Sequence, residues 1–407
     1  MNIIPVYLVI PLMVLAVAFL PAVTRAGPDD PSGANTLVEG NTVFALDLYT
    51  ELKAREGNLF FSPYSISTAL AMTCAGARGD TEVQMRGVLH FTMGRKALHQ
   101  AFSRLLEDLN AIQEKGDIAL HVANSLWAQK GYVFLEDFLD LIDKNYRAAL
   151  YQVDFLKATE EARKQINAWV EEHTNNKIQD LIKPGILNTL TRLVLVNAIY
   201  FKGDWMNPFD EKLTKEAPFY TAPGKPIPVL TMSQKEKFRY AETGQLQILD
   251  MPYAGEKLSM TILLPGQIDG LPSLESTFSP EKLNEWTGLL RRRQVHVLLP
   301  KFKLTSQFEL GKMLISMGMT NAFSRTADFS GMDGAKDLYI AAVIHKAFVD
   351  VNEEGTEAAA ASGVAMELTS APGSPLLFRA DHPFLFLIRH NPSGSILFIG
   401  RLRNPME

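Results

Sequence analysis

The segment from Glu353 to Pro375 constrains the fold of this chain more than any other stretch. It reads EEGTEAAAASGVAMELTSAPGSP, and its Ala, Gly, Ser and Pro content is that of a long surface loop. A structureless loop of this length is uncommon in a compact domain and is usually functional. However, every second residue from Thr356 to Leu368 is small or apolar, whereas the alternate positions include Glu357 and Glu367. This alternation is typical of a strand with one buried face, so the segment suits both a loop and a strand.

The remainder of the chain, from residue 36 onward, shows no linker or repeat and is expected to form one mixed domain. An apolar stripe at Leu98, Phe102, Leu105, Leu106 and Leu109 predicts an amphipathic helix. Strand patterns are found at residues 118–122, 193–196 and 295–299, and a hairpin is expected over 384–401. Because helical patterns dominate the first half and strand patterns the second, the predicted class is α+β rather than βαβ.

Composition excludes several classes of function. The chain of 407 residues carries a formal net charge of −5, which argues against general binding of nucleic acid. Its single cysteine, Cys74, excludes intramolecular disulfides and multi-cysteine metal sites. Arg291–Arg293 is the main cluster of positive charge, and we interpret it as a solvated corner between a helix and a strand. The near-neutral composition favours recognition through the loop over charge steering.

Motifs of catalysis and cofactor binding are missing from the sequence. It has no dinucleotide or phosphate loop, no His-Glu-x-x-His and no Gly-x-Ser-x-Gly, and its eight histidines are scattered. Cys74 lies in an apolar helical stretch and is expected to be a buried, inert thiol. We therefore expect a protein that is not an enzyme and that uses neither a metal nor a cofactor.

The first 26 residues form a separate segment. Residues 3–23 carry no charged side chain, and small residues at Thr24 and Ala26 suit cleavage by signal peptidase. We expect a signal peptide over residues 1–26 and a secreted protein, extracellular or periplasmic. The alternative is an uncleaved membrane anchor, although Pro5, Pro11 and Pro21 suit a spanning helix poorly.

Several motifs, in order along the chain, resemble those of the serpins, the superfamily of serine protease inhibitors. The stretch VDVNEEGTEAAA at 349–360 resembles the hinge of the serpin reactive loop. NLFFSPYSI at 58–66 and LVNAIYFKGDW at 195–205 are similar to the early and central motifs of the family. DHPFLF at 381–386 and FIGR at 398–401 resemble its carboxyl-terminal signature.

This resemblance implies a fold and a mechanism. It implies one serpin domain over 27–407, with three β-sheets, about eight to nine helices and an exposed reactive-centre loop at about 353–380. A target serine protease would cleave the loop, whose amino-terminal part would then insert into the central sheet and trap the acyl-enzyme. The partner would be a serine protease, the inhibitor would be a monomer, and heparin or another polyanion is not expected.

The resemblance also assigns roles to individual residues. The hinge comprises Glu353, Gly355, Thr356, Glu357, Ala358, Ala359, Ala360 and Ala361. The shutter, a polar cluster beneath the sheet, comprises Ser62, Ser65, Asn197 and His345. The breach, where insertion begins, comprises Trp205, Lys301 and Glu353.

The spacing of the family from Gly355 places the scissile bond at Thr369–Ser370, with Met366 or Leu368 as the alternative if the register slips. A small β-branched residue in the primary pocket favours elastase-like or subtilisin-like proteases and excludes trypsin-like ones. The alternative function is that of a non-inhibitory serpin acting as a carrier, chaperone or storage protein. The uninterrupted small residues of the hinge favour inhibition.

Overall fold

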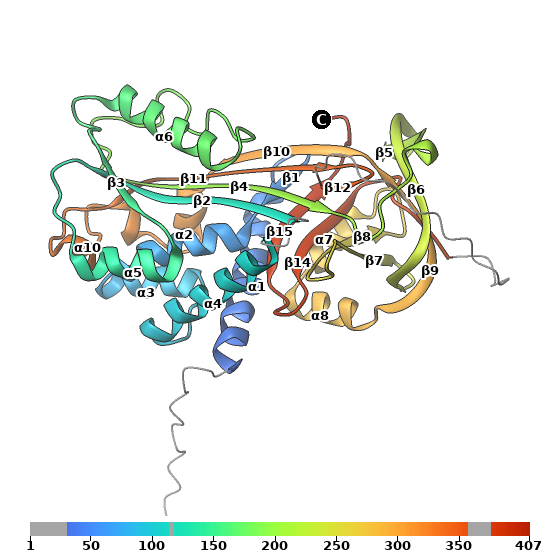
Figure 1. Cartoon of the computed structure of the whole chain (residues 1–407), viewed down its shortest axis with the longest axis horizontal. Helices are drawn as coiled ribbons and strands as arrows, with labels where there is room; N and C mark the ends of the chain where they lie inside the picture. Colours follow the sequence, from blue (N-terminus) through green and yellow to red (C-terminus); the bar gives the residue numbers. More distant parts are fainter. Residues whose placement is uncertain (1–30, 114–117, 357–375) are drawn as a thin grey trace, which may run out of the picture.

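The computed structural model describes residues 31–113, 118–356 and 376–407, in which helices and two sheets alternate along the chain (Figure 1). The α-helices are α1 Pro31–Leu52, α2 Pro63–Gly76, α3 Gly79–Val88, α4 Arg95–Gln113, α5 Glu136–Tyr146, α6 Thr159–His173, α7 Leu271–Thr277, α8 Pro280–Gly288, α9 Gly311–Ser316 and α10 Ser330–Asp333. Two 3-10 helices are η1 Glu211–Leu213 and η2 Asn321–Phe323. The strands are β1 Leu59–Phe61, β2 Ile118–Gln129, β3 Leu150–Val153, β4 Leu193–Asp204, β5 Lys215–Ala222, β6 Lys225–Glu242, β7 Leu246–Pro252, β8 Leu258–Pro265, β9 Arg291–Pro300, β10 Phe302–Glu309, β11 Ile340–Val351, β12 Gly355–Thr356, β13 Leu376–Arg379, β14 Phe384–His390 and β15 Ile396–Leu402.

The six-stranded sheet has the order β10-β11-β12-β4-β2-β3, with β4 near its centre. β4 is antiparallel to β2 and parallel to β11. Its residues from Leu193 to Phe201 are all buried, because α6 covers one face of the sheet and the main core covers the other (Figure 1). Burial on both faces explains why β4 reads as a continuous apolar run rather than an alternating one.

The nine-stranded sheet follows the path β1-β15-β14-β8-β7-β6-β9-β13, with β5 paired to β6. The 18-residue strand β6 pairs with β5, β7 and β9 along different parts of its length. The expected α+β class is confirmed, but the hydrogen-bond pattern of the described residues gives two sheets rather than three because β6 joins neighbouring strand groups. The ten α-helices found in residues 31–113, 118–356 and 376–407 slightly exceed the expected number, and two of them, α9 and α10, have only six and four residues.

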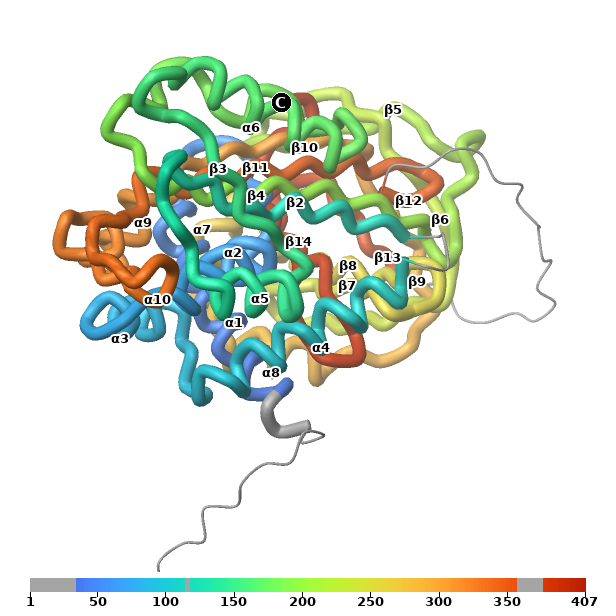
Figure 2. The backbone as a smooth tube through the Cα atoms, turned by 60° about the vertical axis from the view of Figure 1, so that its left-hand side comes forward, coloured from blue at the N-terminus to red at the C-terminus, as the bar shows by residue number. Residues whose placement is uncertain are grey.

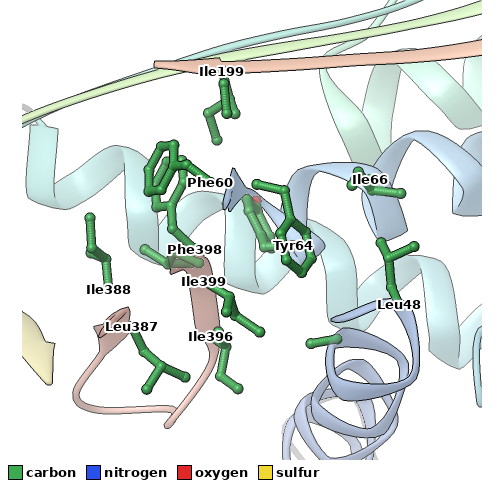
Figure 3. Close-up of a cluster of buried hydrophobic side chains, with 14 of the residues drawn as sticks. Leu48, Phe60, Tyr64, Ile66, Ile199, Leu387, Ile388, Ile396, Phe398 and Ile399 are labelled. Atoms are coloured by element: carbon green, nitrogen blue, oxygen red, sulfur yellow. The ribbon is translucent and has the colours of Figure 1, made fainter. Parts of the chain in front are cut away.

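The main core lies between the two sheets and the helices below them. Ile199 of β4 faces Phe60 and Phe398, and the last two rings stack with centroids 5.0 Å apart (Figure 3). The expected stripe of α4 is confirmed, with Leu98, Phe102, Leu105 and Leu109 buried and Leu106 partly buried. The hairpin expected at 384–401 is formed by β14 and β15.

Two negative findings apply to the described residues. None of their helices is both long and apolar enough to cross a membrane. Nor does this part of the chain gather three or more His, Cys, Asp or Glu side chains that could hold a metal ion. Cys74 is buried in α2, and burial raises the pKa of its thiol to about 12, as expected for an inert cysteine.

Candidate functional site

The candidate site is the seam between β4 and β11. The two parallel strands pair directly from Leu193 and Ile340 to Tyr200 and Phe348. Beyond that point they separate, and β12 lies between them, paired to both (Figure 2). The seam is therefore closed along most of its length and occupied by two residues of the hinge at its open end.

A tight turn brings β12 back between the strands. The side-chain oxygen of Asn352 accepts hydrogen bonds from the backbone N–H groups of Glu354 and Gly355, at 3.1 and 3.2 Å. Glycine is required at position 355, because a Cβ atom there would lie 2.1 Å from the carbonyl oxygen of Gly203. The tight turn and the close backbone approach explain the Asn-x-x-Gly spacing of the hinge.

Thr356, the first position of the alternating pattern, points into the interior. Its side chain is fully buried, and its hydroxyl lies 3.0 Å from the hydroxyl of Tyr253. Tyr253 stacks on Trp205 with ring centroids 4.6 Å apart, which makes this aromatic pair the floor beneath the open end of the seam. Tyr253, which follows β7 and forms an isolated bridge with Trp205, was not identified from the sequence, because only the folded chain brings it beside the hinge.

The structure brings the three residues assigned to the breach close together. The indole N–H of Trp205 donates to the carbonyl of Asn352 at 3.0 Å, and its backbone N–H donates to the carbonyl of Glu354 at 2.8 Å. The ammonium of Lys301 lies 2.6 Å from the buried carboxylate of Glu353, which also accepts a hydrogen bond from Thr214 at 2.7 Å. Burial works to raise the pKa of Glu353, but the hydrogen bonds from Lys301 and Thr214 outweigh it and lower that pKa.

The shutter residues form one buried network halfway along the seam. The backbone N–H of Ser62 donates to Nε2 of His345 at 3.1 Å, so a neutral His345 carries its proton on Nδ1 and donates it to the side-chain oxygen of Asn197. The amide nitrogen of Asn197 then donates to Ser65 and to Asn124. The network thus joins the start of α2 to three neighbouring strands of the sheet.

Asn124 is a member of this network that sequence reasoning missed. It lies on β2 directly opposite Asn197, and its side-chain oxygen also accepts the hydroxyl of Ser65 at 3.2 Å. Only the pairing of β2 with β4 brings Asn124 to the seam, and no local pattern in the sequence marks it.

Burial lowers the pKa of His345 to about 3, although a contact with Asn197 acts in the opposite direction. A second proton on Nε2 would point at the N–H of Ser62, so the network accepts only the neutral ring.

The other expected site residues lie outside the described residues. These are Glu357, Ala358, Ala359, Ala360 and Ala361 of the hinge, Met366 and Leu368, and the bond Thr369–Ser370. The leader expected at residues 1–26 also lies outside them.

The fold and the site together define a mixed central sheet in which two parallel inner strands are joined by a polar network and separated at one end by a returning hinge. Comparison with known proteins gives the family. The chain belongs to the serpin family: the family model described as "Serpin (serine protease inhibitor)" matches residues 39–405.

Individual relatives agree with this assignment. The leukocyte elastase inhibitor of Sus scrofa is 47% identical over 380 residues, which cover 91% of this chain and 99% of that protein. Serpin B3 of Homo sapiens is 43% identical over 391 residues, which cover 91% of this chain and all of that protein. The crystal structure of uncleaved ovalbumin superposes with a TM-score of 0.83 at 34% identity, covering 91% of this chain and all of the ovalbumin chain.

Proposed function

We propose that this chain inhibits serine proteases as a suicide substrate. The hydroxyl of the catalytic serine of the protease attacks the carbonyl of Thr369, the bond to Ser370 breaks, and the new amine leaves with the proton. The freed segment after Thr356 then enters the seam between β4 and β11 while the protease is still held as the acyl-enzyme.

The position of β12 is the observation that supports this proposal most. β12 occupies the place where an inserting strand would start, and it runs antiparallel to both neighbours. Insertion would replace one parallel ladder, β4 with β11, by two antiparallel ladders, which are slightly more stable per residue. Each additional hydrogen bond contributes about 0.5–1.5 kcal/mol, so an insertion of about a dozen residues could release on the order of 10–20 kcal/mol.

The register of β12 fits the alternating pattern. Thr356 lies opposite Gly203, and odd-numbered residues of β4 such as Leu195 and Phe201 belong to the main core. If pairing continues in this register, the small and apolar set from Thr356 to Leu368 faces the core. Glu357 and Glu367 then face the side of the sheet covered by α6.

The target follows from the reactive bond. Thr369 suits the small primary pocket of an elastase-like or subtilisin-like protease. Several relatives carry the name leukocyte elastase inhibitor, which supports the elastase-like choice.

Incubation with pancreatic elastase tests the proposal. We expect an SDS-resistant band at the summed mass of inhibitor and protease, and amino-terminal sequencing of the released peptide should begin at Ser370. Cleavage of the loop without such a band would place the chain in the substrate or non-inhibitory class.

We further propose that residues 1–26 direct export and are removed. This segment precedes the region matched by the family model, which begins at residue 39. Amino-terminal sequencing of the protein after expression in secreting cells should begin at Gly27. A protein that keeps Met1 and remains with the membrane fraction would show that the segment is an anchor.

A further inference from the structure

The strands β6, β9 and β13 are neighbours in the nine-stranded sheet (Figure 2). One face of these three strands is rich in positively charged side chains. We call this surface the cationic face, and it consists of Lys235, Lys237, Arg239, Arg292 and Arg379. All five residues are exposed, whereas Phe238, Val295 and Phe378, which alternate with them, are buried. Strand pairing places Arg292 beside Arg239 and brings residues from three separate parts of the sequence onto one surface.

The positive charge of this face is largely uncompensated. Within the part of the chain that the structure describes, Asp250 is the single acidic partner, and it pairs with Arg239 at 3.4 Å. The other four cations form no ion pair with any described residue. Five positive charges against one carboxylate leave +4 on this face, while the whole chain carries −5.

Two further features bear on what could bind there. The pKa of His296, which lies between Lys235 and the β13 strand, is lowered by burial and then by the charges of Lys235 and Arg379. One end of the face opens into a cavity of about 500 Å³ that is lined by the cations Lys237, Arg239, Arg291 and Arg292 and by the carboxylates of Asp250 and Glu256, so positive charge is in excess there. The face can therefore receive an acidic side chain in the cavity and others along the strands.

The face lies close to the reactive bond. Ser370 is only six residues before Leu376, the first residue of β13, so the two are separated by at most about 20 Å. A protease of about 220 residues has a radius of gyration of about 17 Å and is roughly 40 Å across. A protease bound at Thr369–Ser370 therefore has the reach to contact the cationic face.

We propose that the cationic face docks an acidic surface of the target protease, next to the active-site cleft of that protease, and accelerates its association. The inference depends on the proposed inhibitory function and adds the charge of the partner to it. Leu377, which pairs with His296 on this face, is 45% exposed beside the cations, and such apolar contact suits a protein surface better than a sulfated polysaccharide. Charged residues around an interface act chiefly on the association rate, in a salt-dependent way.

The test compares K235E/K237E with the unaltered chain against an anionic and a cationic pancreatic elastase. Both lysines are exposed and lie on one strand without an acidic partner among the described residues. With the anionic elastase at about 20 mM salt, we expect the association rate constant of the variant to fall about tenfold or more, and the difference to shrink as salt is raised. With the cationic elastase, the rate constant should stay the same or rise.

The matched control is K96E/K164E, which makes the same change of charge at exposed positions on α4 and α6. Its rate constants should stay within about twofold of those of the unaltered chain. The stoichiometry of inhibition should be unchanged in every variant, so a failure to trap protease at all would refute the proposed function rather than the docking face. Equal rate constants for K235E/K237E and the unaltered chain with the anionic elastase would overturn the docking proposal. Acceleration by heparin that K235E/K237E abolishes would also overturn it, because the occupant would then be a polyanion.

Discussion

Replacing Thr356 with arginine perturbs the first residue that enters the seam. Thr356 is fully buried, and its hydroxyl contacts that of Tyr253 at 3.0 Å. Tyr253 is itself fully buried between Trp205 and Phe201. An arginine at this position would have to place its guanidinium among these rings, without an acidic partner.

The expected magnitude follows from the location of β12. An uncompensated buried charge costs at least about 3 kcal/mol, even after relaxation. In the intact inhibitor the two residues of β12 can leave the sheet, so the loss of stability should stay below about 2 kcal/mol. During insertion the arginine must stay in the sheet. A barrier to insertion that is higher by about 3 kcal/mol would slow insertion about 100-fold.

The stoichiometry of inhibition measures this effect. It counts the inhibitor molecules consumed for each protease trapped, and it depends on insertion competing with hydrolysis of the acyl-enzyme. For Thr356→Arg we expect it to rise from near 1 to about 10 or more, as expected when insertion slows 100-fold. SDS gels should show cleaved inhibitor in place of the complex.

Glu354→Arg is the matched control, because it introduces the same side chain two residues earlier, at a partly exposed position outside β12. This control should trap protease nearly as well as the unaltered chain. If Thr356→Arg also trapped protease at the original stoichiometry, the assigned register and the inward orientation of the even-numbered residues would both be wrong.

Three further predictions concern the groups that hold the seam. His345 stays neutral in the folded chain with a pKa of about 3, below its ordinary 6.5, so stability present above pH 6.5 should be lost as the pH falls toward 3. We expect the free energy of unfolding of His345→Gln, measured with urea at low and at neutral pH, to fall by a few kcal/mol less over that pH range than that of the unaltered chain. Asn124→Ala removes the acceptor for Asn197 and should lower the free energy of unfolding by about 1–3 kcal/mol, measured in the same way. Lys301→Met should cost about 1–3 kcal/mol at pH 7 and less below pH 4.5, because the lowered pKa of Glu353 stabilises the fold only while that carboxylate is charged.

The sequence predicted those features of the fold that arise from local periodicity. The apolar stripe of α4 and the hairpin of β14 and β15 follow from spacing and turn residues within a short window. The joining of strand groups by β6 could not be predicted in this way, because it depends on which partners one long strand finds along its length.

The same distinction applies to the candidate site. The resemblance to serpins identified the breach and shutter residues that the structure brings together. It did not identify Asn124 or Tyr253, which reach the seam only through pairing and packing over more than 70 residues of chain. Arg291–Arg293 was interpreted as a solvated corner, because the sequence does not show that β6 places three more cations beside it.

The register of β12 gives the shutter a role in the proposed insertion. Thr356 pairs with Gly203 on one side and with Val351 on the other. If residues are counted along β4 and β11 from these pairs, a strand inserted in this register would have Ser362 between Asn197 and His345. These two residues pair with each other in the closed seam. The hydrogen bond between those two side chains must break for insertion to pass that point, and burial would make unpaired polar groups there costly. Ser362 is small and carries one donor and two acceptors, so it can enter between them and take up the bonds they lose. The polar network would therefore be matched in both states of the sheet, holding the seam shut before cleavage and accommodating the new strand after it.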